Sequence, residues 1–148
     1  MITERLEFVS LDQLDFDEEF KNALGELEQR IFEDYSQFMP ADPNREGYEV
    51  EHKMTTEFKK GLAYSPKGSK YLKVCTGTDN GQTSVWGFIA KGDFQAKNKK
   101  KTGGQFIEFK EGDILKAAGW NTPILNSPRG NIFKKDYTIS WTGPNYLT

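Results

Sequence analysis

Four lysines cluster within residues 96–104, AKNKKKTGG, as Lys97, Lys99, Lys100 and Lys101. The run ends in two glycines and lies among β-rich segments, so it is predicted to form the tip of a hairpin. Closely spaced ammonium groups at such a tip neutralise several phosphates, which gives a salt-dependent attraction to nucleic acid of any sequence. A lysine run at a turn can equally serve solubility or protect an edge strand, and this alternative stays open.

A long and stiff loop over residues 119–133, GWNTPILNSPRGNIF, supplies the next candidates. Its two prolines restrict the residues before them to extended conformations. Arg129 stands between Pro128 and Gly130, where it would project from a fixed turn and suit a phosphate or a carboxylate. Trp120 would stack on a base or anchor one end of the loop by burial. The alternative for Arg129 is structural, with its guanidinium bonded to backbone carbonyls of its own loop.

Aromatic residues make up 14% of the chain, and several fall in the basic, strand-rich part. Exposed rings beside lysines are typical of small β-proteins that stack the bases of single strands. Rings that alternate along strands are more often core, because each one removes a large apolar area from water. Both interpretations apply to Tyr71, Trp86, Phe88, Phe94, Trp120 and Trp141.

The sequence offers few residues for metal or nucleophile chemistry. One histidine, His52, and one cysteine, Cys75, cannot build a zinc cluster, and no CxxC or HxxxH spacing occurs. The nucleophile elbow GxSxG and the two glycine-rich nucleotide motifs are also missing from the sequence. We therefore expect no catalytic residue, no metal site and no cofactor, although a Mg²⁺ or Ca²⁺ site made of carboxylates alone stays open as an alternative. A small hydrolase that uses two acidic residues stays open as a minor alternative, because spacing along the sequence says little about spacing in the fold.

The net charge of −2 conceals two oppositely charged parts. Residues 1–65 contain 16 acidic and 7 basic residues, a net charge of −9, whereas residues 66–148 contain 6 acidic and 13 basic residues, a net charge of +7. This division favours binding of an anion through the basic part. It also fits an interaction or assembly protein whose acidic helix binds a second copy or another protein.

Length and composition predict one soluble domain over residues 1–148. No stretch of eighteen apolar residues occurs, so no membrane-spanning helix is predicted, and the acidic N-terminus does not resemble a signal peptide. The single cysteine permits no internal disulfide, which suits a reducing cytoplasm.

The acidic part must position its residues on one amphipathic helix, predicted over residues 15–39. Asp15 or Asp17 is expected to cap its start, and Pro40 and Pro43 to end it. A short second helix is predicted within residues 50–65. The apolar stripe of the long helix consists of Phe20, Leu24, Leu27, Ile31, Tyr35 and Phe38.

The basic part consists of short β-rich runs with glycine-rich turns. The Asn80-Gly81 pair predicts a hairpin between the first two runs. No segment between the runs is long enough for the helix of a parallel crossover, so the strands are expected to be antiparallel. The predicted fold class is α+β, with an N-terminal helical segment packed on a curled antiparallel sheet or a small β-barrel of five to six short strands. The runs are 70–77, 83–90, 104–110, 130–133 and 137–143.

The same part contains FKEGDILKAAGWNTPILNSPRGNIF and, further on, ISWTG. With these motifs, residues 68–147 resemble small uncharacterised proteins encoded by tailed phages. The resemblance implies a phage origin and a cytoplasmic location in an infected bacterium, and it implies no activity. The residues that carry it are Phe109, Gly112, Asp113, Trp120, Pro123, Arg129, Gly130, Asn131, Trp141 and Gly143.

The function predicted from the sequence is a non-enzymatic binding module, with single-stranded nucleic acid as the favoured ligand. Lys99, Lys100, Lys101 and Arg129 are expected to contact phosphates, and Trp120 to stack or to anchor its loop.

Overall fold

The computed structural model describes residues 8–38, 58, 61–68, 70–77, 83–97, 106–125, 127–140 and 142–144. A 3₁₀ turn, η1 (Leu11–Gln13), precedes one long helix, α1 (Glu18–Phe38). The strands that follow are β1 (Ala63–Ser65), β2 (Tyr71–Thr76), β3 (Ser84–Ala90), β4 (Phe94–Lys97), β5 (Phe106–Phe109), β6 (Ile114–Leu115), β7 (Ile139–Ser140) and β8 (Gly143–Pro144).

The strands form an antiparallel sheet in the order β1-β2-β3-β6 and two separate pairs, β4-β5 and β7-β8. The α+β class is confirmed, whereas the barrel alternative is wrong for the described strands, because their main sheet stays open. The described part also has more strands than the five to six predicted. Strands β1, β4 and β6 lie outside the predicted runs, and the two residues of β6 are too few to leave a recognisable run in a sequence. The predicted run 137–143 contains β7 and the first residue of β8. The predicted run 130–133 forms no strand, and its Asn131 makes only an isolated bridge with Asp113.

Helix α1 forms where the apolar stripe predicts it. The side chain of Asp17 caps its start by accepting the backbone N–H of Phe20 at 2.8 Å, and Glu18 and Glu19 place negative charge at the positive end of the helix dipole. Of the predicted second helix, Phe58 and Gly61 are helical, but the residues from Ala63 to Ser65 already belong to β1. The buried side chains of α1 include Phe20, Leu24, Leu27, Ile31 and Tyr35.

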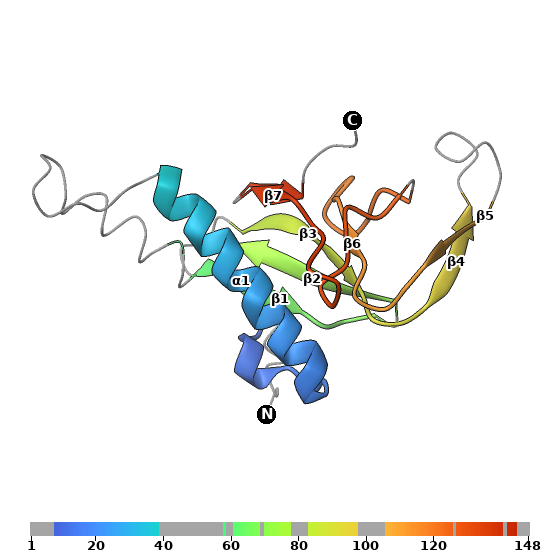
Figure 1. Cartoon of the computed structure of the whole chain (residues 1–148), viewed down its shortest axis with the longest axis horizontal. Coiled ribbons are helices and arrows are strands. Elements are labelled where there is room, and N and C mark those ends of the chain that lie inside the picture. Colours follow the sequence, from blue (N-terminus) through green and yellow to red (C-terminus); the bar gives the residue numbers. More distant parts are fainter. Residues whose placement is uncertain are drawn as a thin grey trace, which may run out of the picture.

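The main sheet has two faces because side chains alternate along each strand. Leu72 and Val74 point to one face, where they pack with Ile89 and with α1; we call it the helix face. Lys73 lies between them in β2 and points to the opposite face, where its register partner is Phe88. Figure 1 shows α1 lying across β1, β2 and β3, with the β4-β5 hairpin at the other end of the molecule.

The opposite face is covered in part by the β4-β5 hairpin, and we call it the hairpin face. Phe109 of β5 packs with Phe88 and Leu115 of the sheet and stacks on Phe94 of β4, with ring centroids 4.9 Å apart. The rings of Tyr71 and Phe94 form a T-shaped pair with their centroids 5.5 Å apart. A fully buried side chain of this size contributes about 1.5–3 kcal/mol. This second apolar cluster therefore holds the hairpin on the sheet.

The long loop extends the sheet beyond β6. The backbone of Ile114 accepts a hydrogen bond from Arg129 at 2.7 Å and donates one to Gly130 at 2.9 Å, and Ile132 donates to Gly112 at 2.9 Å. Gly112 and Gly130 have φ values of 86° and 129°, which favour glycine. The segment is thus a paired cover for the sheet edge and not a free loop.

Candidate functional site

Of the four lysines of the predicted basic tip, the structure describes Lys97 alone. Lys97 is the last residue of β4 and pairs in register with Phe106, the first residue of β5. The prediction of a hairpin around the run is thereby confirmed. Lys99, Lys100 and Lys101 lie outside the described residues, so their part in binding stays a prediction.

Arg129 holds its own loop. Its Nη1 donates to the backbone carbonyl of Ser127 at 2.6 Å, and its own backbone pairs with β6. Partial burial lowers the pKa of the guanidinium. Nearby, the Nζ of Lys116 donates to the carbonyl of Pro144 at 2.9 Å, and burial and the charge of Arg129 lower the pKa of Lys116. These contacts fit the structural alternative for Arg129, and a phosphate contact by this residue stays a prediction.

Trp120 stands at the tip of a tight turn. Ala117 and Pro123 form an antiparallel bridge, and Ala118 and Gly119 both donate to the carbonyl of Thr122, at 2.7 and 3.1 Å. The turn leaves Trp120 42% exposed, an unusual exposure for so large a ring. The rings of Phe8 and Trp120 form a T-shaped pair with their centroids 6.2 Å apart. The predicted anchoring by burial is therefore only partial, and much of the ring stays accessible.

A cavity of about 400 Å³ opens on the hairpin face beside this tip. Its floor belongs to the sheet, one side is the connection between β1 and β2, and the tip contributes a side chain from the other side. The lining residues are Ser65, Lys67, Gly68, Lys70, Tyr71, Lys73, Phe88 and Asn121.

Lys73 is the central side chain of this cavity. It is only 8% exposed, and its Nζ donates to Asn121 Oδ1 at 2.6 Å and lies 4.2 Å from the centroid of the Trp120 ring. A buried ammonium normally pairs with a carboxylate, because leaving water is costly for a charge. Among the described residues, the contacts of the Lys73 side chain are an amide and an aromatic face, and both leave its positive charge uncompensated.

Two further lysines accompany Lys73. Lys67 and Lys70 are exposed, and the Nζ of Lys70 lies 5.5 Å from the centroid of the Phe94 ring. The connection that carries them is fixed by Lys91, whose Nζ donates to the carbonyl of Pro66 and, at 2.7 Å, to that of Gly68. No acidic residue occurs among the described residues that line the cavity. We call this cavity, with Trp120 at its edge, the lysine cavity.

The other aromatic residues that were candidates for base stacking lie either in the lysine cavity or in the core. Tyr71 and Phe88 line the lysine cavity, and Phe94 packs in the apolar cluster under the hairpin. Trp86 is buried on the helix face, where its Nε1 donates to the carbonyl of Ser140 at 2.9 Å, so it is core. Trp141 lies outside the described residues.

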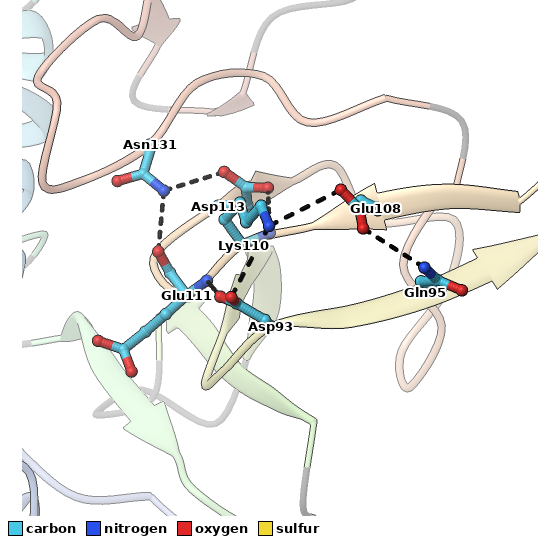
Figure 2. Close-up of polar contacts among 7 residues, drawn as sticks. All are labelled: Asp93, Gln95, Glu108, Lys110, Glu111, Asp113 and Asn131. Atoms are coloured by element: carbon cyan, nitrogen blue, oxygen red, sulfur yellow. Dashed lines mark hydrogen bonds and ion pairs between the residues drawn. The ribbon is translucent and has the colours of Figure 1, made fainter.

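Asp113 and Asn131 form a polar cross-link (Figure 2), and both residues are buried. Asn131 Nδ2 donates to Asp113 Oδ1 at 3.0 Å and to the carbonyl of Glu111 at 2.9 Å. The other oxygen of Asp113 accepts the N–H of Lys110 at 2.7 Å. Because its oxygens are occupied by the fold, Asp113 is a poor general base.

Two further carboxylates in Figure 2 share a cation. Lys110 Nζ lies 3.8 Å from Asp93 Oδ2 and 3.7 Å from Glu108 Oε2, on an exposed surface. Across the ranges that the structure describes, no three His, Cys, Asp or Glu side chains gather as metal ligands would. These ion pairs give the hydrolase alternative no support.

The acidic and basic parts also contact each other within the chain. Glu26 of α1 binds Lys135 Nζ at 2.9 Å and Arg30 at 3.4 Å, and these two cations lower the pKa of the Glu26 carboxyl. This contact lies on the α1 side of the molecule, away from the hairpin face. Binding of a second protein by the acidic helix stays a prediction.

Sequence reasoning missed Lys67, Lys70, Lys73 and Asn121. The available signal was the position of Lys73 between Leu72 and Val74, which places it on the opposite face of β2. The burial of Lys73 comes from the tip, which lies 48 residues further along the chain.

Comparisons with known proteins add no relative. No protein-family model matches the chain, and no significant match occurs among curated proteins or solved structures. The resemblance to tailed-phage proteins therefore stays a prediction from the motifs. None of the described helices has the length and apolar character needed to cross a membrane.

Proposed function

We propose that this protein is a non-enzymatic module that binds single-stranded nucleic acid through its hairpin face. The observation that carries the proposal is the buried ammonium of Lys73, which lacks a carboxylate partner among the described residues and lies against the exposed ring of Trp120. A positive charge kept in this way is available to an anion. The nearby ring offers a surface on which a base can stack.

The charges around Lys73 add to its attraction. Lys67 and Lys70 supply two more ammonium groups on the same cavity. In the sequence, Lys99, Lys100 and Lys101 follow shortly after the last residue of β4 and are predicted to add further positive charge. Ammonium groups that neutralise phosphates release the counterions of a nucleic acid, so binding weakens as the salt concentration rises. A ligand that combines phosphates with flat rings matches both kinds of group at this site.

The binding test is a titration with an oligodeoxythymidylate of about 12 nucleotides, within the site sizes of single-strand binders. Fluorescence anisotropy of the labelled strand is measured between about 50 and 200 mM salt. If Lys67, Lys70 and Lys73 each contact a phosphate, a plot of the logarithm of the association constant against the logarithm of the salt concentration should have a slope of about −2 or steeper. Absence of binding at low salt with micromolar protein would contradict the proposal.

Matched lysine variants locate the site. Lys70→Ala should make the slope shallower by about 0.7, the contribution of one contact to a single strand. Lys134→Ala removes an exposed lysine from a turn next to Lys135, which pairs with α1, and should leave the slope near that of the wild type. Equal slopes for the two variants would place binding elsewhere on the protein.

A second measurement follows the indole of Trp120. Bases that stack on this ring should quench the tryptophan fluorescence of the wild type, and Trp120→Phe should lose most of the quenching while it keeps an aromatic face. Quenching that persists in Trp120→Phe would contradict the stacking role of this residue.

A further inference from the structure

The three lysines of the lysine cavity lie at different depths. Lys73 is 8% exposed and shares the floor with Phe88, whereas Lys67 and Lys70 are exposed at the entrance. An anionic group that enters therefore meets two ammonium groups first and a third at the floor. The ammonium groups thus extend from the entrance to the floor of the cavity. This arrangement suits the end of a nucleic-acid strand better than its middle.

The charge of the cavity also distinguishes two kinds of phosphate. A terminal phosphate is a monoester with a charge of about −1.5 to −2 at neutral pH and three strong acceptor oxygens. A phosphate inside a strand carries one charge and is linked on both sides. Three ammonium groups without an acidic residue among the described lining residues match the charge of the terminal group more closely.

Each of the remaining polar side chains of the lining can donate a hydrogen bond to a ligand. An ammonium can only donate, so Lys73 fixes the amide of Asn121 with Oδ1 toward itself and leaves the NH₂ group for another partner. Ser65 and Tyr71 add two hydroxyls, and burial raises the pKa of Tyr71, which keeps its hydroxyl protonated. A group rich in acceptors, such as a phosphate, fits such a lining.

The size of the cavity restricts the ligand further. A volume of about 400 Å³ lies near the lower end of the range for small-molecule sites, about 300–1,000 Å³, and suits one nucleotide. From depth, charge, donors and size together, we infer that the lysine cavity binds a phosphomonoester, the terminal phosphate of a single strand or that of a free mononucleotide. The inference rests on the proposed function and narrows its ligand to a phosphorylated end.

The test is isothermal titration calorimetry of the full chain with five ligands. Three are oligodeoxythymidylates of the length used above, with a 5′-phosphate, a 3′-phosphate or hydroxyls at both ends, and two are thymidine monophosphate and thymidine. A strand with a phosphate at one end should bind at least about tenfold tighter than the hydroxyl strand, because it alone offers the doubly charged group. Thymidine monophosphate should bind, and thymidine should not.

The outcomes separate this inference from the proposed function. Equal affinities for all three strands would overturn the inference and leave the proposed function standing. Binding of thymidine monophosphate, with no binding of any strand, would support the inference and contradict the proposed function. No binding of any of the five ligands would overturn both.

A charge-matched pair of variants assigns the phosphate to the lysine cavity. Asn121→Asp keeps the shape and the acceptor that faces Lys73 and adds a negative charge at the exposed tip, so the tenfold preference for a phosphorylated end should disappear. Asn22→Asp makes the same change at an exposed position of α1 and should retain the preference. Since both positions are exposed, both variants should fold, which circular dichroism checks. A preference retained in Asn121→Asp would overturn the assignment.

Discussion

The two faces of the main sheet are made by alternating residues of the same strands, but they are covered differently. On the helix face, Leu72 and Val74 pack under the apolar stripe of α1. On the hairpin face, the β4-β5 pair covers Phe88 and Leu115 but leaves a cavity over Lys73. The first face is closed by a long element with a continuous apolar stripe. The second is closed by a narrow hairpin and the tip of a loop.

Because of this difference in cover, we expect the helix face to contribute most of the stability and the hairpin face to contribute the proposed anion binding. A face covered by a continuous apolar stripe has no place for a charge, because burial without a partner is costly. A face that is only partly covered can keep an ammonium beside an amide and an aromatic ring at the wall of a cavity, as Lys73 is kept. Stability should therefore depend mainly on the helix face, and anion binding mainly on the hairpin face.

The largest expected effect comes from substituting two neighbouring residues of β2 whose side chains lie on opposite faces of the sheet. Leu72→Ala removes a fully buried side chain from the helix face and should lower the free energy of unfolding by about 2–5 kcal/mol. Lys73→Met replaces a buried charge by an apolar chain of similar length and should change that free energy by less than about 1 kcal/mol. Anion binding should instead fall in Lys73→Met. Urea unfolding and the strand titration measure both quantities, and a large loss of stability in Lys73→Met would contradict the division.

The next effect concerns Gly130, which lies where the long loop passes the helix-face core. A Cβ at this position would lie 2.5 Å from the Cβ and 2.8 Å from the Cα of Tyr137, and φ is 129°. Gly130→Ala should therefore cost about 2–3 kcal/mol of stability. Gly92→Ala is the control, because a Cβ there meets no atom within 4 Å. Similar losses in both variants would show that close packing against Tyr137 is not the cause.

Helix α1 and the β2-β3 pair follow from local patterns, and so they could be predicted. The stripe of α1 repeats with the period of a helix, and Asp17 is a capping residue three positions before Phe20. The Asn80-Gly81 turn signal lies between two predicted runs that form the β2-β3 pair. The lysine run with its glycines predicts the hairpin around it, but β4, one of the two strands of that hairpin, lies outside the predicted runs. These features depend on residues close together in the sequence.

The lysine cavity depends on residues far apart, and so it could not be predicted. The alternation in β2 places Lys73 opposite Leu72, but it does not say what covers that face. The cover is the tip with Trp120 and Asn121, whose position is set by the pairing of the loop with β6. That same pairing explains why the sheet stays open, since the edge of β6 is occupied by Arg129 and Gly130.

A smaller effect on stability is expected from a substitution of Arg129, which the sequence analysis predicts as a phosphate ligand. Its guanidinium donates to the carbonyl of Ser127 at 2.6 Å, so Arg129→Met should lower the free energy of unfolding by about 1 kcal/mol. The affinity for the single strand should change less than it does in Lys70→Ala. A loss of affinity larger than that of Lys70→Ala would assign the phosphate to Arg129 and remove the lysine cavity from the centre of the site.

The smallest effect tests the helix face through pH. Tyr64 is fully buried and donates to Glu28 Oε1 at 2.8 Å, and burial raises the pKa of the Glu28 carboxyl above its ordinary 4.5, partly offset by this bond. The folded chain thus holds this proton to a higher pH than the unfolded chain, and stability from Glu28 is lost as the pH rises through the folded pKa.

Glu28→Gln should be more stable than the wild type at pH 7, by less than about 1 kcal/mol because water still reaches the group. The difference should vanish at pH values well below 4.5, where the carboxyl is protonated in both the folded and the unfolded chain. Urea unfolding at both pH values measures it, with Glu33→Gln, at an exposed position of α1, as the control for net charge. A difference that grows toward low pH would mean that Tyr64 stabilises the ionised carboxylate more than burial disfavours it.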